Sequence, residues 1–496
     1  MAVSKTVVII FAIIVFSFIS RFPLVEKMHS HTDSSSLVMA LNHFDFLQET
    51  PAPPGYPLYL AFGKIMSFLT HDPHSALLGV SIIATAIGGI AYYFAGKNIQ
   101  GREVGAIASI IFLTSPAIYF FGLTVYPYLL MIAIEMVVIT LCYRSFIANK
   151  TSGLFLGLSY AILLGIRPQE FITTLPLVFI VFYSMRRHEK LLSISAFSMI
   201  SLAWIAPFLS VAGGIVNYIA VLSKGASEGL PFPSLNPLLT KKFELLNGAF
   251  LTIGAGLPFS LLYFISTKLK KKVIVFFLLW CIPSLLFNLF IRTEHAGYQE
   301  GYLSLGIIAA ALFLGKLYKT NRTIAVVVVS LVAIVNLAIF FYNRDPLYQR
   351  SYRQSSFHYS DIVRNDYSLE KKIDYISENF NSEETVILAG PYFWRHVRYY
   401  LPEYKIYMVD KLFNGGNSHE IIEARNLLFK RTKYANDTIK LSPRIRNVII
   451  FDDEGKNFTI DAARNIPFKG ITNLVVMPIK NSSLYFEYYK IERIGI

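Results

Sequence analysis

Apolar runs close to the length of a bilayer crossing recur along the first 342 residues of this chain. A transmembrane helix needs about 20 predominantly apolar residues, because each residue advances the helix by only about 1.5 Å. The pattern predicts about eleven spans: residues 5–20, 77–95, 104–121, 125–142, 152–166, 170–185, 191–212, 246–266, 273–291, 302–318 and 323–342. We therefore expect an α-helical polytopic membrane protein.

Two segments decide how the spans alternate across the membrane. Residues 153–185 are too long for one crossing and contain Arg-Pro-Gln-Glu, so we divide them there and place Arg167 to Glu170 at the outer surface. Residues 55–69 are short and interrupted by Lys64, so we lay them along the membrane interface. Reversing either decision alone would invert the predicted topology of everything downstream.

The lysines and arginines between the spans predict the orientation. Cytoplasmic loops carry an excess of Lys and Arg, and a cytoplasmic N-terminus places five basic clusters on that side. These clusters are Lys97/Arg102, Arg144/Lys150, Arg186/Arg187/Lys190, Lys268/Lys270/Lys271/Lys272 and Lys316/Lys319/Arg322. The first outer loop at 21–76, the loops at 213–245 and 292–301, and the C-terminal part then face away from the cytoplasm. We expect a multi-pass cell-membrane protein.

Composition separates this membrane module from a C-terminal domain. Only 16% of the residues are charged, against about 25% in an average soluble protein. Residues 343–496 nevertheless hold 23 of the 46 basic and 19 of the 32 acidic residues. They predict a water-facing, extracytoplasmic α/β domain after a transmembrane module at 1–342. The net charge of +14 then mostly reflects topology, and we expect no nucleic-acid partner.

Several classes of function find no support in the sequence. Cys142 and Cys281 lie in separate apolar runs, so we expect neither a disulfide framework nor a cysteine-based metal site. No GxxxxGK[ST] or GxGxxG motif occurs, which argues against ATP-driven transport. The first apolar run ends in SFISRFPL (17–24) without a small-x-small cleavage site, so we interpret it as an uncleaved span rather than a signal peptide.

Within the C-terminal domain the pattern predicts both strands and helices. Apolar runs bounded by turn residues predict strands at 384–390, 446–453, 473–479 and 485–494. Amphipathic spacing predicts helices at 391–401 and 419–434. In the first of these helices, Trp394, Arg395, His396 and Arg398 either line an acceptor path or pack the helix on the sheet. Asn436, Asn457 and Asn481 lie in glycosylation sequons, which also arise by chance.

The loop after the first predicted span carries the most distinctive pattern. Asp33 stands near its start, followed by apolar residues at helical spacing, which predict a helix lying on the membrane surface. These apolar positions are Leu37, Ala40, Leu41, Phe44 and Leu47. Prolines and Gly55 between residues 51 and 57 end this helix and force an extended, turned segment that leads back to the bilayer.

This arrangement resembles the first outer loop of membrane glycosyltransferases of the GT-C superfamily. The resemblance rests on the single aspartate after the first span, the surface helix and PAPPGYPLYL (51–60). It is strongest to the branch related to glycosyltransferase family 39, which includes protein O-mannosyltransferases and aminoarabinose-transferase-like proteins. GIRPQEF (165–171), HAGYQEGYLSLGI (295–307) and WRHVRYYLPEYKIYMV (394–409) resemble further segments of that branch. Ala52 stands where a histidine is usual, so any role of that histidine is missing.

The resemblance implies transfer of a sugar from a polyprenyl-phosphate donor to a glycan, lipid or protein acceptor on the non-cytoplasmic face. A hydroxyl acceptor must lose a proton as it attacks, and Asp33 is the candidate general base. The phosphate leaving group needs nearby cations more than a general acid, and guanidinium groups bind phosphate well. The candidates for donor-phosphate binding are Arg167, Arg292 and His295. The candidates for other substrate contacts are Asp45, Tyr56, Tyr298 and Glu300.

No metal-ligand pattern accompanies the aspartate. Some GT-C enzymes, oligosaccharyltransferases among them, use paired acidic residues with a divalent ion, whereas HTDSSS (31–36) offers one carboxylate. His31 and Asp33 could share a metal, but two ligands from one loop are a weak signal. We therefore expect no cofactor and predict a metal-independent, inverting single displacement.

Each candidate also has a purely structural interpretation. Asp33 is equally a candidate N-cap that accepts a backbone N–H. Arg167 and Arg292 lie at predicted span ends, where arginine commonly reaches toward lipid headgroups. Glu135, deep in its span, either marks a cavity interior or is a hydrogen-bonded carboxylic acid between helices. We favour the second interpretation for Glu135.

Two other functions compete with glycosyl transfer. A secondary transporter or flippase would explain the spans, but it would not explain a 154-residue outer domain. We also find no inverted repeat with broken helices at matched positions, the usual pointer to a transporter. An inactive scaffold subunit that keeps the fold is the third alternative, since one aspartate carries most of the catalytic argument.

Overall fold

The computed structural model describes residues 4–48, 50–150, 152–229, 246–290, 300–342, 357–390, 392–409, 419–426, 428–434, 444–452 and 487–490. Contacts divide the chain into two units. The helical unit comprises Met1–Val25 and Pro53–Asp361, and the α/β unit comprises Glu26–Ala52 and Ile362–Ile496. Residues 26–52, which we had placed in the membrane module, thus group by contacts with the C-terminal residues. The domain boundary at residue 342 stays a prediction.

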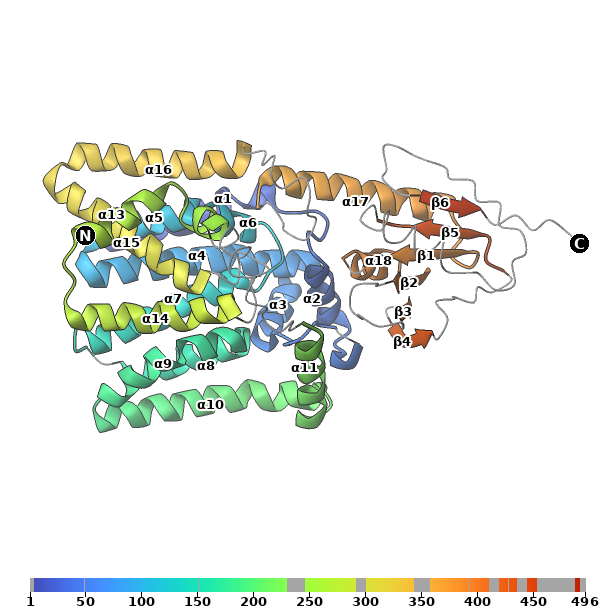
Figure 1. The fold of residues 1–496 in the computed structure, drawn as a ribbon, viewed down its shortest axis with the longest axis horizontal. Coiled ribbons are helices and arrows are strands. Elements are labelled where there is room, and N and C mark those ends of the chain that lie inside the picture. The colour runs from blue at the N-terminus through green and yellow to red at the C-terminus, as the bar shows by residue number, and fades with distance from the viewer. Residues whose placement is uncertain are drawn as a thin grey trace, which may run out of the picture. The chain divides into compact units, whose positions relative to one another are not determined.

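The helical unit follows the apolar pattern of the sequence, and every predicted span is helical over most of its length. Its helices are α1 (Lys5–Ile19), α3 (Pro57–Thr70), α4 (Pro73–Gln100), α5 (Arg102–Thr114), α6 (Pro116–Phe121), α7 (Tyr128–Phe146), α8 (Gly153–Ile166), α9 (Pro168–Ser184), α10 (Arg187–Val211), α11 (Ile215–Gly229), α13 (Leu257–Ser266), α14 (Lys271–Phe290), α15 (Glu300–Thr320) and α16 (Arg322–Tyr342). Short 3₁₀ turns lie at Phe22–Leu24 (η1) and Gly254–Gly256 (η3). Figure 1 shows α4, α10, α14 and α16 running along a common direction.

Among the described residues, eight helical stretches are long and apolar enough to cross a membrane. The remaining three predicted spans form shorter helices. Residues 104–121 are divided into α5 and α6 at Ser115, whose extended backbone (ψ 132°) precedes Pro116, as the steric demand of proline requires. Helices α8 and α9 have 14 and 17 residues. The α-helical membrane fold is confirmed, and the count of eleven crossings stays a prediction.

Small residues let α4, the centre of the helical unit, approach its neighbours closely. Helix α4 packs against α5, α7, α3 and α1, and most of its apolar window is buried. Gly96 of α4 faces Gly105 of α5 so closely that a Cβ on Gly96 would lie 2.8 Å from the Gly105 Cα. Glycine at such crossings is typical of membrane helices, because dispersion contacts between backbones hold the helices together.

Gly105→Ala is expected to destabilise the helical unit by about 1–3 kcal/mol, the usual cost of overpacking a tight core. The new Cβ would lie 3.1 Å from the backbone nitrogen of Lys97 and would clash with the carbonyl oxygen of Tyr93, so α4 and α5 must separate. Thermal unfolding in detergent measures the effect. Gly256→Ala is the matched control, because its nearest new contacts are at 3.5 Å; equal midpoints for the two variants would contradict the prediction.

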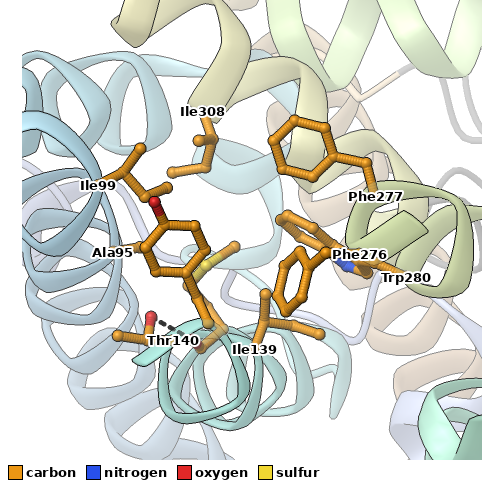
Figure 2. Close-up of a pocket in the computed structure, with 10 residues that line it drawn as sticks. Ala95, Ile99, Ile139, Thr140, Phe276, Phe277, Trp280 and Ile308 are labelled. Carbon is orange, nitrogen blue, oxygen red and sulfur yellow. Dashed lines mark hydrogen bonds between the residues drawn. The ribbon is translucent and has the colours of Figure 1, made fainter. Parts of the chain in front are cut away.

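A small apolar cavity lies in the helical unit between α4, α7, α14 and α15 (Figure 2). Its lining residues include Ile99, Ile139, Phe276, Trp280 and Ile308. It offers about the room of one water molecule, which is far too little for a sugar or a prenyl chain. This cavity is a packing feature rather than a binding site.

The described residues of the α/β unit form a six-stranded sheet with the order β4-β3-β2-β1-β5-β6. The strands are β1 (Thr385–Ala389), β2 (Lys405–Val409), β3 (His419–Arg425), β4 (Leu428–Tyr434), β5 (Asn447–Ile450) and β6 (Glu487–Lys490). Strand β1 is parallel to β2 and β5, and the other pairs are antiparallel. The predicted strands at 384–390, 446–453 and 485–494 are confirmed; the one at 473–479 lies outside the described residues, as do the three sequons.

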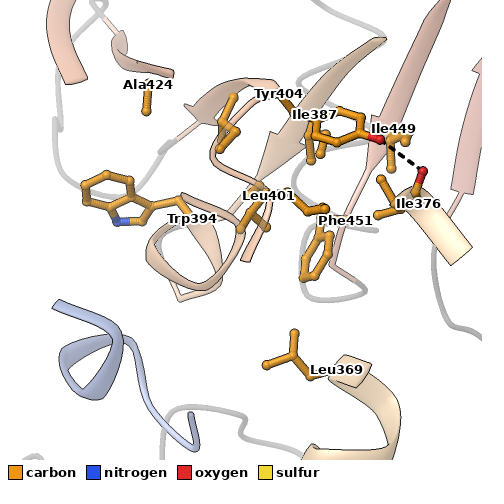
Figure 3. Packing of buried hydrophobic residues seen from close by; sticks show 12 residues of the cluster. Leu369, Ile376, Ile387, Trp394, Leu401, Tyr404, Ala424, Ile449 and Phe451 are labelled. Carbon is orange, nitrogen blue, oxygen red and sulfur yellow. Dashed lines mark hydrogen bonds between the residues drawn. The ribbon is translucent and has the colours of Figure 1, made fainter. Parts of the chain in front are cut away.

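Helices pack on this sheet to form one apolar core. They are α17 (Tyr359–Asn379), which we had not predicted, and α18 (Trp394–Tyr400). A further helix, α2 (Thr32–Asn42), packs against α18. Ile376 of α17 and Trp394 of α18 are buried in a cluster with Ile387 and Ile449 of the sheet (Figure 3). The Tyr404 hydroxyl donates to the Ile376 carbonyl oxygen (3.1 Å), which fixes α17 to the loop before β2.

The helix predicted at 419–434 was wrong, because these residues form the β3–β4 hairpin. The chain reverses at Asn426, whose φ of +50° belongs to the left-handed region that asparagine tolerates better than most residues. Strand β3 then completes the backbone hydrogen bonds along the edge of β2. Tertiary pairing thus overrides the helical spacing of the apolar residues.

A helix in the first outer loop is confirmed as α2, but it ends at Asn42, before the predicted positions Phe44 and Leu47, and its burial contradicts a position on a membrane surface. Every residue from Ser34 to Leu41 is buried, including three consecutive serines. A surface helix would expose one polar face. Helix α2 instead packs against α18, so the sequence of the loop serves the core of the α/β unit.

Candidate functional site

The residues singled out in the sequence fall into both units. In the α/β unit lie Asp33 and Asp45, and in the helical unit lie Tyr56 and Arg167. Three others lie outside the described residues: Arg292, His295 and Tyr298. Of Glu300 the structure describes only the backbone, at the first residue of α15.

Asp33 lies in the first turn of α2 and forms an ion pair with Arg395 of α18. The Arg395 Nη1 atom donates to Asp33 Oδ1 at 2.9 Å. The aspartate side chain is 35% exposed and that of the arginine 13%, so the carboxylate is open to solvent while the guanidinium is mostly covered. A charge-assisted hydrogen bond of this kind is roughly twice as strong as a neutral one.

The N-cap interpretation of Asp33 is wrong, because His31 occupies that position. The His31 Nδ1 atom accepts a hydrogen bond from the Asp33 backbone nitrogen at 3.1 Å. This leaves the Asp33 side chain outside the capping interaction. A nitrogen that accepts here carries no proton, so the neutral His31 bears its proton on Nε2.

The segment before Asp33 is fixed to α17 and α18 by hydrogen bonds to its backbone. Asp366 accepts from the backbone nitrogens of Lys27 and Met28, each at 2.9 Å. The Tyr392 hydroxyl donates to the Ser30 carbonyl oxygen at 2.9 Å. Further on, Ser36 accepts from the Ala52 nitrogen. The backbone that carries Asp33 is therefore held by residues from the far end of the sequence.

Two buried histidines flank the pair. His31 meets Tyr392 edge-on with ring centroids 5.5 Å apart, and His396 stacks on the same tyrosine at 5.9 Å. Desolvation lowers the pKa of His31 to about 4, although the neighbouring Asp33 opposes this shift. Desolvation also lowers the pKa of His396 to about 4. Both rings are neutral near pH 7, so Arg395 supplies the positive charge beside Asp33.

Acidification is expected to loosen this part of the α/β unit before the rest. A histidine whose folded pKa is depressed binds its proton more readily when unfolded, so stability is lost as the pH falls from about 6.5 toward 4. The loss is up to about 1.4 kcal/mol per pH unit for each histidine. Faster hydrogen exchange of peptides 26–48 and 394–400 at pH 5 than at pH 7, after correction for intrinsic rates, is the expected result. His396→Gln should halve the effect; pH-independent protection would contradict the prediction.

Asp45 and Tyr56 have structural surroundings of their own. Asp45 is exposed, and its Oδ1 atom accepts from the Gln48 nitrogen at 3.1 Å, which stabilises the turn η2 (Phe46–Gln48). Tyr56 is buried, with a φ of +47° directly after Gly55 at +97°. Such a backbone is strained for a tyrosine and is often found at functional sites. The predicted turn is confirmed, and substrate contact by either residue stays a prediction.

Arg167 lies in a buried polar cluster inside the helical unit. It is the residue between α8 and α9, and its guanidinium carbon lies 4.6 Å above the Tyr128 ring. Glu170 follows one turn later and accepts from the Thr173 hydroxyl at 3.0 Å. A Cβ on Gly301 would lie 3.1 Å from a Glu170 oxygen and 3.3 Å from a Glu135 oxygen. Two carboxylates therefore approach each other across this glycine.

This burial corrects one interpretation of the sequence. Arg167 has no exposed surface and Glu170 only 2%, so Arg167 does not reach for lipid headgroups. The placement of this turn at the outer surface of the membrane stays a prediction. Glu135, also 2% exposed, lies between α7, α9 and α15, which favours a carboxyl group packed between helices. Sequence spacing could not bring Glu135, Glu170 and Gly301 together, since they come from three helices.

Metal ligation finds no geometric support within the part of the chain that the structure describes. No group of three or more His, Cys, Asp or Glu side chains there is arranged around a common point. His31 Nδ1 lies 3.9 Å from Asp33 Oδ2, and the same nitrogen already accepts from the backbone. The His31 nitrogen nearest to the Asp33 carboxylate is therefore already engaged in a hydrogen bond within the loop.

Comparison with known proteins gives a likeness in structure alone. No family model and no curated protein sequence matches the chain. ArnT from Cupriavidus metallidurans bound to undecaprenyl phosphate superposes with a TM-score of 0.60 at 11% identity, over 99% of this chain and 98% of that one. The chain has the GT-C fold. Its eight apolar helical stretches and this fold make it a multi-pass membrane protein.

Two further solved structures resemble the chain less closely. The apo state of the same ArnT gives a TM-score of 0.57 at 10% identity, over 98% of this chain and 97% of that chain. The apo oligosaccharyltransferase of Archaeoglobus fulgidus gives 0.47 at 10% identity, covering 79% of this chain and 63% of its own. The superpositions on ArnT confirm, at the level of the fold, the resemblance found in the sequence.

Proposed function

We propose that this GT-C protein is a membrane glycosyltransferase that uses a polyprenyl-phosphate-linked sugar donor. The observation that carries the proposal is the superposition on ArnT over nearly the full length of both chains. That relative was solved bound to undecaprenyl phosphate, a polyprenyl phosphate of the kind the donor would release. The acceptor is a glycan, lipid or protein hydroxyl on the non-cytoplasmic face.

In the proposed reaction Asp33 is the general base. The acceptor oxygen attacks the anomeric carbon of the sugar, and its proton passes to the Asp33 carboxylate. The bond between that carbon and the phosphate oxygen breaks, and polyprenyl phosphate leaves as an anion. A single displacement inverts the anomeric configuration. Partial exposure of the Asp33 carboxylate supports this role, since a base must meet its substrate.

The leaving phosphate requires positive charge nearby. We propose Arg292 and His295 for this task, with Tyr298 and Glu300 as further substrate contacts from the same segment. Arg167 has no exposed surface, so contact with a phosphate would require the turn between α8 and α9 to open. Donor-phosphate binding by Arg167 stays a prediction.

The predicted topology and the absence of a cofactor belong to the same proposal. A cytoplasmic N-terminus and an extracytoplasmic α/β unit would place Asp33 on the face where lipid-linked sugars are consumed. The carboxylate acts as a base without a metal ion in this scheme, because the phosphate leaves as a stable anion.

The test is donor turnover by the purified full chain in detergent, with a membrane extract as the source of acceptors. Release of polyprenyl phosphate from a panel of polyprenyl-phosphate sugars is expected, and nucleotide sugars should be inert. Addition of EDTA should leave the rate unchanged. Turnover of nucleotide sugars alone would overturn the donor class.

The same preparation distinguishes glycosyl transfer from the transporter alternative. Reconstituted into liposomes, a flippase would move lipid-linked sugar between leaflets without cleaving it. Movement without cleavage would overturn the proposed function, whereas cleavage with an inverted product would support it.

A further inference from the structure

Arg395 meets Asp33 from the opposite end of the chain, 362 positions away. The two residues belong to different helices of the α/β unit, α18 and α2, which pack against each other. Nothing in the local sequence of either helix requires this contact. It exists because residues 26–52 are built into the unit that the C-terminal residues form.

Arg395 is held more firmly than an arginine in an exposed surface ion pair. Its neighbours Trp394 and Val397 are buried in the core beneath the sheet, so α18 has little freedom to shift. The Arg395 guanidinium carbon also lies 5.3 Å above the Trp394 ring. A planar, always-charged guanidinium on a fixed helix fixes both the direction and the charge state of its partner.

Two contacts restrain Asp33, one at its backbone and one at its carboxylate. His31 caps the helix through the Asp33 backbone, and Arg395 holds one side-chain oxygen, Oδ1. The titratable groups beside Asp33 include Arg395, His31 and His396. Both histidines are neutral near pH 7 because desolvation lowers their pKa values to about 4.

We propose that Arg395 is the positioning residue of Asp33, and that the C-terminal part of the α/β unit thereby acts on the chemical step. The inference rests on the proposed function, in which Asp33 is the base. Arg395 does not touch the reacting atoms. It orients the carboxylate and keeps it ionised, because an adjacent cation favours the charged form. Catalytic groups that lose such support become too loose to act efficiently.

The experiment compares Arg395→Gln, Arg395→Lys and wild type in the donor-turnover assay. For the glutamine variant we expect a fall in kcat of about 10–100-fold with little change in KM, as for loss of an outer contact that orients a catalytic group. The pH below which its activity falls should move upward by about one unit, because the supporting charge is gone. Lysine keeps the charge and should restore the pH profile and part of kcat.

Two controls separate positioning from a general structural role. Arg425→Gln removes another arginine of the same unit, one that pairs with Glu383 and is exposed, and should behave as wild type. In an Asp33→Asn background, Arg395→Gln should cause little further loss, because residues that act through one another are not additive. Hydrogen exchange checks that the glutamine variant is folded. If it is not, Arg395→Met replaces it, because methionine keeps an apolar stem beside Trp394.

The outcomes of this test exclude different proposals. A wild-type kcat in the Arg395 variants, or a change in KM alone, would overturn the positioning role while the glycosyltransferase stands. Full additivity with Asp33→Asn would overturn it as well. Failure of the wild type to cleave any polyprenyl-phosphate sugar would instead overturn the proposed function, and the positioning role with it.

Discussion

Asp33→Asn is expected to lower kcat for the polyprenyl-phosphate donor by about 10²–10⁴-fold, the usual contribution of a general base. Asparagine has nearly the same shape as aspartate, and its amide oxygen can still accept a hydrogen bond from Arg395 Nη1. In the wild type this nitrogen lies 2.9 Å from Asp33 Oδ1. It cannot take the acceptor proton. The fold should survive, because the N-cap of α2 is His31 rather than Asp33.

The measurement is the initial rate of polyprenyl-phosphate release by wild type and variant at saturating donor. Asp374→Asn is the matched control: it is an exposed aspartate of α17 in the same unit, and its rate should equal that of the wild type. Thermal unfolding checks that both variants are folded. Equal rates for wild type and Asp33→Asn would exclude Asp33 as the base and direct the search to Asp45.

The helical unit could be predicted from the sequence because its signal is local. Apolar length and basic loops mark each helix in turn, and even the division at 153–185 falls where the structure has it, at Arg167 between α8 and α9. The break at Ser115 was missed, although Pro116 carries the physical reason for it.

The α/β unit was harder to predict because its contacts are long-range. Residues 419–434 have helical spacing, but the free edge of β2 and the turn at Asn426 make them a hairpin. The apolar positions of α2 suggested a membrane surface, whereas the buried face belongs against α18. Spacing along a helix shows which residues share a face, but not what covers that face.

In the candidate site, too, the sequence revealed the local features and missed the long-range contact. Asp33 was found from its place in a loop that resembles a known family, whereas Arg395 was noted only as a residue that either lines an acceptor path or packs its helix on the sheet. Their pairing across 362 residues left no trace in the local pattern. Arg167 was also found locally, at a helix end, but one of its two interpretations, contact with lipid headgroups, fails because the structure buries it completely.

Arg167→Met is expected to destabilise the helical unit by about 3–5 kcal/mol, the cost of breaking a buried charge arrangement by removing one partner. Arg167 acts electrostatically on Glu170, and Glu170 approaches Glu135 across Gly301. Without the guanidinium, the buried carboxyl group of Glu170 loses the positive charge beside it. Methionine fills much of the same volume, so the loss is electrostatic rather than a cavity effect.

Thermal unfolding of the full chain in detergent measures this loss, with Arg186→Met as the matched control. Arg186 is an exposed arginine at the N-terminal end of α10, and its replacement should shift the midpoint little. A second substitution, Glu170→Gln, should restore part of the stability of Arg167→Met, because it removes the carboxyl group that has lost its positive partner. An unchanged midpoint for Arg167→Met would show that the cluster is held without its arginine, and the guanidinium would then be available for a phosphate after all.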